Sequence, residues 1–530
     1  MSTAIPAQLS ASIHSIPALL AARALEQPDD EALVINNRRL TWREVERETA
    51  RVAGGLHELG VRAGEHVGIC AGNSVEWIST WFAAAHLGAA VVPLNTRWKD
   101  EELAWALDYA DVRYLVFDQR LLKVDYLAIF GRLRSRLPKL RAYLLVGDAR
   151  CDWGSPFEAL AGDPPPTCAR PESITLIQFT SGSTARPRGV MLTQAGMLAN
   201  ARGGSLHLGV RQGDRYFCPR PFFHVAGSTG GPLRALAAGA CLISIPSFDA
   251  AAAIAILRAE RCEMVAGNDA MFLKLLESFD GREGLRLRGG QAAAGPEVQR
   301  QIHERLGITG LCCSYGLSES SPGVAFSRWD DPIEDRIAGL MWPLPGVSIR
   351  IRDPVSGVDN APGESGEILV KGPSVMVGYY KMPEATAAVL DTEGWLTTGD
   401  LGVLEADGRL RFIGRLKDII RVGGENVSPA EVEDLLLRHP EVSAAQVVAL
   451  PDARLGEVPV AYVALRTGAR VDGATLIAWA RERIAGFKVP RHIGIVPSFD
   501  DVLTGSGKPQ KAILRQRALA DFAAIGGSQA

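Results

Sequence analysis

Apolar and polar positions form two alternating patterns along the first 300 residues, one typical of helices and one typical of strands. Apolar residues spaced by three and four predict helices over residues 44–59, 75–87, 101–109 and 250–261. Short runs rich in β-branched residues predict strands at 66–70, 89–92, 114–117, 174–179 and 241–245. This order of strand, helix and strand predicts parallel sheet with helices on both faces. Asp249 directly precedes the last of these helices and is expected to cap it.

The pattern changes after about residue 339. Turn residues become dense, and short strands at 347–351, 366–370 and 410–413 predict a β-rich subdomain. A small α+β unit follows from residue 415, with strands at 419–422, 442–450 and 458–465 and helices at 429–438 and 474–484. The predicted fold class is therefore α/β, with a large N-terminal domain at 1–414 and a small C-terminal domain at 415–530. We place a hinge between them at 414–418.

The composition favours a globular enzyme, since 47% of the 530 residues are hydrophobic and 22% are charged. A net charge of -3 gives no reason to expect a nucleic-acid partner. The eight cysteines have neither zinc nor disulfide spacing, and neither G-x-S-x-G nor H-E-x-x-H occurs. Because neither a signal-peptide pattern nor a transmembrane segment is evident, we expect a soluble, cytoplasmic protein.

Residues 180–189, Thr-Ser-Gly-Ser-Thr-Ala-Arg-Pro-Arg-Gly, are the most informative segment. They follow a predicted strand and combine four hydroxyls, two glycines and two arginines. Backbone N–H groups, hydroxyl donors and positive charge together suit a chain of phosphates. The Walker spacing G-x-x-x-x-G-K-[ST] is absent. The alternative for this segment taken alone is a polar surface turn.

Five further segments follow this loop in a fixed order. They read Pro-Phe-Phe-His at 221–224, Ser-Tyr-Gly-Leu-Ser-Glu at 314–319, Gly-Trp-Leu-Thr-Thr-Gly-Asp at 394–400, Gly-Arg-Leu-Lys-Asp-Ile-Ile-Arg-Val-Gly-Gly-Glu-Asn at 414–426, and Leu-Thr-Gly-Ser-Gly-Lys at 503–508. Together the six segments make the chain resemble the adenylate-forming superfamily of acyl-CoA synthetases, luciferases and peptide-synthetase adenylation domains. The resemblance spans about residues 40–515.

This resemblance implies an AMP-forming acid–thiol ligase that uses ATP, Mg²⁺ and coenzyme A. A carboxylate would attack the α-phosphate in line to give acyl-AMP and pyrophosphate, and the thiol of CoA would then displace AMP. Such chemistry depends mainly on positioning and charge neutralisation. A rotation of the small, mobile C-terminal domain would exchange the face carrying Lys508 for the face carrying residues 423–426.

The resemblance also implies roles for residues of the phosphate loop. The expected nucleotide contacts there are Thr180, Ser181, Gly182, Ser183, Thr184 and Arg188. Two positions depart from the family pattern, because Ala185 stands where the family has Gly and Arg188 where it has Lys. Arg188 keeps the positive charge and can grip a phosphate with two donors. Ala185 is expected to reduce the freedom of the loop without abolishing the reaction.

The remaining roles implied by the resemblance come from scattered positions. For the nucleotide, Tyr315 would stack on adenine beside Gly316 and Gly290, and Asp400 and Arg415 would hold the ribose or phosphate. Thr184 and Glu319 would hold Mg²⁺. For the acid and CoA, His224 would line the acyl pocket, Lys508 would bridge the carboxylate and the α-phosphate, and Gly423 and Gly424 would border the pantetheine tunnel. Taken singly, each residue also fits a structural role. A packed core tyrosine, a solvated glutamate, a turn aspartate and an exposed lysine are the alternatives for Tyr315, Glu319, Asp400 and Lys508.

The acid is not specified, but the walls expected around it at 222–228, 265–271 and 314–323 are rich in Gly, Ala and Ser with a few aromatics. They predict an apolar carboxylate, of medium or long chain or with a ring, and hence a role in fatty-acid or lipid metabolism. Asp269 keeps an amino acid substrate open. The alternatives are an enzyme that loads a carrier protein, a luciferase-type oxygenase and a non-catalytic nucleotide sensor. A homodimer also remains open.

Overall fold

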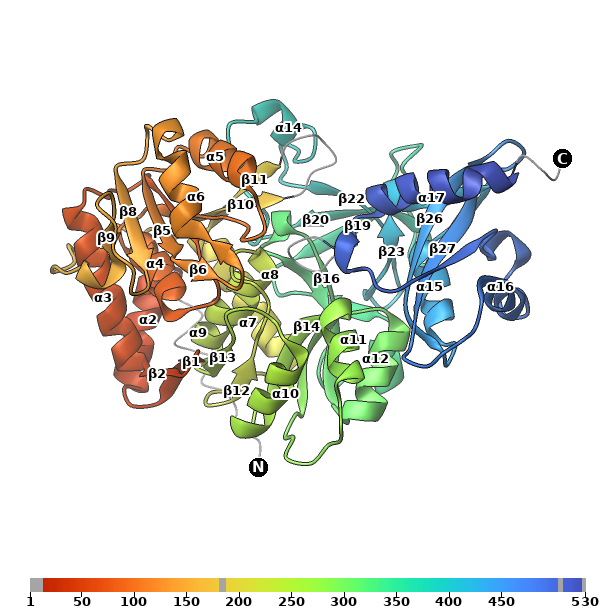
Figure 1. The fold of residues 1–530 in the computed structure, drawn as a ribbon, viewed down its shortest axis with the longest axis horizontal. Helices are drawn as coiled ribbons and strands as arrows, with labels where there is room; N and C mark the ends of the chain where they lie inside the picture. Colours follow the sequence, from red (N-terminus) through yellow and green to blue (C-terminus); the bar gives the residue numbers. More distant parts are fainter. Residues whose placement is uncertain (1–12, 181–186, 504–508, 527–530) are drawn as a thin grey trace.

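Three large sheets and the helices around them make up the protein (Figure 1). The computed structural model describes residues 13–180, 187–503 and 509–526. A large N-terminal domain, coloured red to teal, holds an eight-stranded and a thirteen-stranded sheet. A smaller C-terminal domain, coloured blue, holds a five-stranded sheet. This architecture confirms the predicted α/β fold class with a large and a small domain.

The eight-stranded sheet is built around six parallel strands, of which β10 also pairs antiparallel with β11. Its order is β21 (Gly378–Tyr379), β11 (Arg188–Thr193), β10 (Ile174–Thr180), β4 (Ala90–Pro93), β3 (His66–Cys70), β5 (Tyr114–Asp118), β8 (Ala142–Val146) and β9 (Ser155–Pro156). The buried strands read as continuous apolar runs, as expected where helices cover both faces.

The thirteen-stranded sheet changes from parallel to antiparallel pairing at β16. Its order is β19 (Ser348–Arg352), β20 (Ser365–Lys371), β22 (Leu396–Leu404), β23 (Leu410–Arg415), β18 (Leu340–Pro343), β17 (Gly323–Phe326), β16 (Gly310–Gly316), β15 (Gly289–Ala293), β14 (Met264–Asn268), β12 (Arg215–Phe217), β13 (Cys241–Ser244), β1 (Glu31–Ile35) and β2 (Arg38–Thr41). The β-rich region predicted after residue 339 therefore extends this sheet, because β18 pairs with β17.

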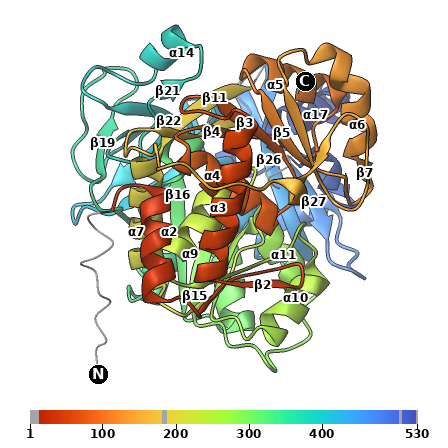
Figure 2. The same cartoon turned by 90° about the vertical axis from the view of Figure 1, so that its left-hand side faces the viewer.

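Helices fill the space between the two sheets and cover both outer faces, so five layers alternate. The helices that share an apolar core with both sheets, and so lie between them, are α2 (Ile16–Glu26), α3 (Trp42–Glu58), α4 (Val75–His86), α7 (Gln194–Leu208) and α9 (Arg234–Ala238). The outer face of the eight-stranded sheet is covered by α5 (Asp100–Tyr109) and α6 (Tyr126–Leu133). The outer face of the thirteen-stranded sheet is covered by α10 (Ala250–Ala259), α11 (Asp269–Glu277) and α12 (Pro296–Gln301). Figure 2 shows α2 and α3 side by side in the middle layer.

The C-terminal domain packs three helices on its small sheet. It contains β24 (Ile420–Val422), β25 (Glu425–Val427), β26 (Val442–Asp452), β27 (Gly456–Leu465), β28 (Ile493–Val496), α15 (Pro429–Leu437), α16 (Gly473–Arg481) and α17 (Lys511–Gly526). A single 3₁₀ turn at Leu416–Asp418 separates β23 of the large sheet from this domain. The hinge predicted at 414–418 coincides with this turn, although its function as a hinge stays a prediction.

The helix ends lie within three residues of the predicted ones, and several coincide with them, which is within the usual uncertainty of helix boundaries. The predicted cap is present, since Asp249 Oδ1 accepts from the Ala252 N–H over 2.8 Å. A second cap at Thr41 forms a complete capping box with Glu44. Within the described ranges, no helix combines the length and apolarity needed to cross a membrane.

Candidate active site

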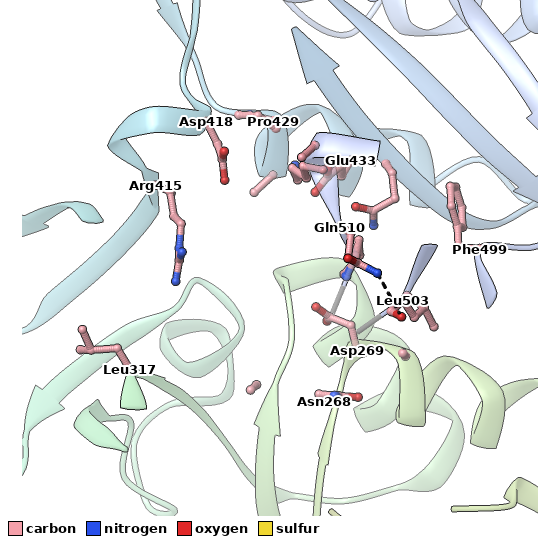
Figure 3. Close-up of a pocket in the computed structure, with 18 of the residues that line it drawn as sticks. Asn268, Asp269, Leu317, Arg415, Asp418, Pro429, Glu433, Phe499, Leu503 and Gln510 are labelled. Carbon is pink, nitrogen blue, oxygen red and sulfur yellow. Dashed lines mark hydrogen bonds and ion pairs between the residues drawn. The ribbon is translucent and has the colours of Figure 1, made fainter. Parts of the chain in front are cut away.

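A cavity of about 1720 Å³ opens between the two domains (Figure 3). Seven of the predicted site residues line it, namely Thr180, Arg188, His224, Gly316, Glu319, Asp400 and Arg415. Asn268 and Asp269 face it from the N-terminal domain, and Glu433, Leu503 and Gln510 face it from the C-terminal domain. The cavity lies at the carboxyl ends of the parallel strands β14, β15 and β16. Ligands of α/β proteins bind at this end of the strands, so the topology alone favours a ligand site here.

The ends of the phosphate loop open into this cavity. β10 ends at Thr180 and β11 begins at Arg188, and the two residues are register partners in an antiparallel hairpin. Thr180, Pro187 and Arg188 line the cavity. The predicted contacts Ser181, Gly182, Ser183 and Thr184, together with Ala185, lie outside the described residues.

Arg188 and Glu319 are joined through Tyr379, a residue that the sequence patterns did not single out. The Arg188 guanidinium lies over the Tyr379 ring, 5.2 Å from its centre. The Tyr379 hydroxyl donates to Glu319 Oε1 over 2.9 Å. Burial, assisted by the Glu319 charge, raises the pKa of Tyr379, so its hydroxyl stays protonated and can donate. Tyr379 stands in a two-residue strand, β21, where sequence carries no signal for such a contact.

Glu319 is the one described residue among the two predicted Mg²⁺ ligands. It lies in a 3₁₀ turn, Ser318–Ser320, directly after β16, and it lines the cavity. Among the described residues, no cluster of three or more His, Cys, Asp or Glu side chains could hold a metal by itself. Glu319 by itself offers carboxylate oxygens, the kind of ligand that Mg²⁺ prefers.

Tyr315, Asp400 and Arg415 form one contact group at the other side of the cavity. The Tyr315 hydroxyl donates to Asp400 Oδ2 over 2.8 Å, and Arg415 Nε lies 3.5 Å from Asp400 Oδ1. Asp400 and Arg415 are register partners on β22 and β23, which explains their proximity. Asp400 is only 4% exposed. Burial, followed by the Asp400 charge, raises the pKa of Tyr315 well above its ordinary value.

Phe412 completes this group and was also missed by sequence reasoning. Its ring stacks on Tyr315, with ring centres 5.1 Å apart and planes at 21°. It is 40% exposed on β23, two positions before Gly414 in the cavity wall. An aromatic residue in a short strand looks like ordinary core, so only the tertiary structure reveals this partner.

The two predicted glycines of the adenine side are required by the backbone packing. A Cβ at Gly290 would lie 2.0 Å from the Val265 carbonyl oxygen, and one at Gly316 would lie 1.8 Å from that of Pro322. Gly290 also has φ +151°, which side chains rarely adopt. Close approach of strands is therefore a sufficient reason for both glycines. Gly316 also lines the cavity.

His224 lies in the cavity wall at the start of α8 (Val225–Ser228). Its Nδ1 accepts from the Ala226 N–H over 3.2 Å, so the ring caps this short helix. The turn before it is firmly held, because Asn73 Oδ1 accepts from the Phe222 N–H and the Phe222 ring packs on Trp77, with ring centres 5.5 Å apart. His224 therefore has a structural role as well as a position facing the ligand space.

The C-terminal domain brings one of its two predicted faces to the cavity. Lys508 lies outside the described residues, but Leu503, Pro509 and Gln510 on either side of it line the cavity. Gln510 Nε2 donates to the Leu503 carbonyl over 3.5 Å. Gly423 and Gly424 form the exposed turn between β24 and β25, with φ of +58° and +95°. Neither of them is among the residues that line the cavity.

Polar contacts hold the domains in this arrangement. Asp434 Oδ1 accepts from the Glu297 N–H at the start of α12 over 2.6 Å, and Lys274 pairs with Asp500 over 2.9 Å. Asp269 faces the cavity and accepts from the Gly295 N–H over 3.0 Å. Its side chain is exposed to the space of the cavity.

Comparison with known proteins agrees with this geometry. Residues 20–380 match the family described as AMP-binding enzyme, and residues 431–508 match the AMP-binding enzyme C-terminal domain. A putative acyl-CoA synthetase of Bacillus subtilis (strain 168) is 33% identical over 542 residues, which cover 96% of this chain and 98% of that protein. A feruloyl-CoA synthase of Amycolatopsis is 34% identical over 503 residues, covering 93% and 97%.

The fold is shared with solved structures. An ATP-bound structure of MatB from Rhodopseudomonas palustris superimposes with a TM-score of 0.84 at 27% identity and covers 95% of this chain and 99% of its own. Together with the sequence matches, this confirms the resemblance to adenylate-forming enzymes.

Proposed function

The chain belongs to the AMP-binding enzymes, here with acid–thiol ligases as relatives, and from this premise we propose that it is an ATP-dependent acyl-CoA synthetase. One observation carries the proposal. The ends of the phosphate loop, Asp400 and both flanks of Lys508 all line a single cavity, and the buried Tyr315 hydroxyl donates to Asp400. A cavity that gathers these groups from two domains can hold a nucleotide and an acid against each other.

In the first half-reaction the proposed roles follow from charge and hydrogen-bonding capacity. Asp400 accepts from the ribose hydroxyls, Tyr315 flanks adenine, and Thr180 and Arg188 contact the phosphates together with residues 181–184. Bound Mg²⁺, held by Glu319 and Thr184, would neutralise phosphate charge. Lys508 bridges the attacking carboxylate and the α-phosphate, which lowers the repulsion between two anions.

In the second half-reaction the C-terminal domain has to turn, because a Lys508 positioned for the first step would occupy the approach that the CoA thiol needs. We place the hinge at the 3₁₀ turn Leu416–Asp418, between the proposed domains 1–414 and 415–530. Such motions rest on a few residues that absorb a large backbone change. The cavity contains the Lys508 flanks, whereas the Gly423–Gly424 turn is exposed, and this is the arrangement that acyl-AMP formation requires.

For the acid we propose an apolar body, of medium or long chain or with a ring. Phe223, Leu317, Ala293 and Gly316 supply apolar or small wall residues beside His224. A relative named feruloyl-CoA synthase agrees with a ring-bearing acid. Asp269 is an acidic group of the cavity wall that would suit an ammonium group, so an amino acid substrate stays an alternative. A cytoplasmic location and a homodimer stay predictions.

Exchange of labelled pyrophosphate into ATP, measured with a panel of acids, tests the proposal. We expect exchange that depends on an apolar acid and on Mg²⁺, followed by CoA ester formation when CoA is added. Exchange without a CoA ester would favour the carrier-protein loader, and no exchange with any acid would favour a nucleotide sensor. Preference for acetate or free amino acids over octanoate and aryl acids would contradict the proposed acid class.

A further inference from the structure

The proposed reaction leaves two buried arginines without a role. Arg220 and Arg234 are only 6% and 1% exposed. Arg220 Nη1 and Arg234 Nη1 donate to the same atom, Gln291 Oε1, over 2.9 and 2.8 Å. Gln291 Nε2 in turn donates to Ser314 Oγ over 2.9 Å. A single neutral amide therefore serves two guanidinium groups.

No negative charge accompanies these two cations in the described part of the chain. The other acceptors are the Gly267 carbonyl for Arg220, and the Tyr216 hydroxyl at 3.2 Å and the Gly230 carbonyl at 3.5 Å for Arg234. Arg234 Nε is buried without a hydrogen-bond partner among the described residues. A buried cation without an opposite charge is costly, since its lost hydration is only partly replaced. Arginine cannot escape this cost by losing its proton.

The cluster of Arg220, Arg234 and Gln291 lies next to residues that line the cavity. Gln291 precedes Ala293 by two residues on β15, and Ser314 precedes Gly316 by two residues on β16. Residues two apart on a strand share a face and are separated by about 7 Å. Ala293 and Gly316 both line the cavity. An acyl group that passes Ala293 on this face of β15 therefore moves toward Gln291 and the arginines.

The segment opposite the guanidinium groups is also unusual. Gly230 belongs to a π-helical turn, Thr229–Leu233, and such turns occur frequently at functional sites. A Cβ added at Gly230 would lie 3.4 Å from Arg234 Nη1 and 3.7 Å from Arg220 Nη1. The glycine thus keeps this side of both guanidinium groups free of a side chain. The Thr229 hydroxyl is also buried without a partner among the described residues.

We propose that the inner end of the acyl site binds a second oxygen acceptor of the substrate acid, a carboxylate or a carbonyl, between Arg220 and Arg234 in place of Gln291 Oε1. The arginine fork matches such oxygens in geometry and charge. The inference rests on the proposed function and refines it: the acid has an apolar body and a polar far end. Sites built to bind a polar group reject analogues that lack it, because their own polar groups are left unpaired.

Matched acids test this selection. Acyl-CoA formation is measured for plain, ω-carboxy and (ω−1)-oxo acids of equal length, for example octanoate, suberate and 7-oxooctanoate, in a series from six to ten carbons. For at least one length we expect kcat/KM to be at least tenfold higher for an acid with a distal oxygen than for the plain acid. The ratio of suberate to 7-oxooctanoate tells which acceptor the site takes.

Gln291→Glu is the sharpest variant, because it supplies a carboxylate to both arginines from within the protein. We expect it to melt no lower than the wild type and to keep its activity on the plain acid within threefold. The preference for a distal oxygen should fall to about twofold or less. Arg220→Gln, which removes one cation, should lower the use of the dicarboxylate more than that of the oxo acid.

Two outcomes would overturn the inference. One is equal use of plain and oxygen-bearing acids at every length by the wild type. The other is a Gln291→Glu variant that lowers kcat/KM for all acids by one common factor, as a purely structural role would. Failure of the proposed function is distinct, because then no acid of any kind would support pyrophosphate exchange.

Discussion

Removing the carboxylate of Asp434 should slow acyl-AMP formation selectively, because this side chain ties the small domain to the large one. Its Oδ1 accepts from the Glu297 N–H over 2.6 Å, while its Oδ2 accepts from Arg438 within its own domain. Hydrogen bonds to a charged group are worth about 1.5–3 kcal/mol each. Since water satisfies both partners once the domains part, we expect Asp434→Ala to destabilise the observed arrangement by about 1.4 kcal/mol, a tenfold change in the domain equilibrium.

The second cross-domain contact contributes less. The Lys274–Asp500 pair has side chains exposed by 49% and 62%, and such surface pairs are worth about 0–1 kcal/mol. Asp434→Ala should therefore lower the pyrophosphate exchange rate by up to about tenfold. The transfer of a preformed acyl group from acyl-AMP to CoA should be unchanged or faster, because the domain leaves this arrangement more easily.

Two control variants make the assay specific. Asp434→Asn keeps an oxygen acceptor for the Glu297 N–H and should lose less exchange activity than Asp434→Ala. Asp501→Ala removes an exposed carboxylate that pairs with Arg517 inside the C-terminal domain, and it should change neither half-reaction. Unchanged exchange in Asp434→Ala, or an equal loss in both half-reactions with the fold intact, would refute the reasoning.

Three further predictions test the reaction and the fold. Lys508→Ala should nearly abolish acyl-AMP formation while CoA still reacts with added acyl-AMP; equal slowing of both steps would contradict the alternating domain. Lys417→Pro fixes φ in the 3₁₀ turn and should spare pyrophosphate exchange but impair CoA ester formation; equal rates of ester formation in variant and wild type would argue against this hinge. Burial raises the pKa of Asp118 from 3.8 to about 7, so the unfolded chain ionises first and stability falls as pH rises from about 4 to 7. Asp118→Asn keeps an acceptor for the Gly72 N–H and should raise the melting temperature by an amount that grows over this range and is constant above it; a difference independent of pH would contradict this.

The elements of the fold were predictable where the signal is local. The strand His66–Cys70 and the helix α10 with its Asp249 cap follow from side-chain spacing and cap chemistry, and the structure has both. The sequence could not reveal that His66–Cys70 and Cys241–Ser244 belong to two different sheets. Both are short buried apolar runs, and only the packing of the middle helical layer decides which sheet each one joins.

The site was predictable to the extent that it lies in short ordered motifs. Tyr315, Glu319, Asp400 and Arg415 were expected. The structure brings the last three to one cavity, and the buried Tyr315 donates to Asp400. Tyr379 and Phe412 were not expected, because each reaches its partner only through tertiary packing. Arg220 and Arg234 were not predicted from the sequence for a related reason.

Arg220 directly precedes the Pro-Phe-Phe-His segment, and Arg234 stands in an apolar stretch, so both looked like incidental residues. Nothing in the local spacing tells that two guanidinium groups will share one amide oxygen. That information depends on three elements separated by up to 71 positions in the chain.

The two faces of β16 have a consequence for how this enzyme can diverge. Ser314 contacts Gln291 on one face, while its neighbour Tyr315 contacts Asp400 on the other. If the proposed roles hold, substitutions on the first face can change the choice of acid without moving the groups proposed to hold the nucleotide. A one-residue slip of this strand would instead exchange both faces at once. We therefore expect β16 to tolerate substitutions but not insertions or deletions.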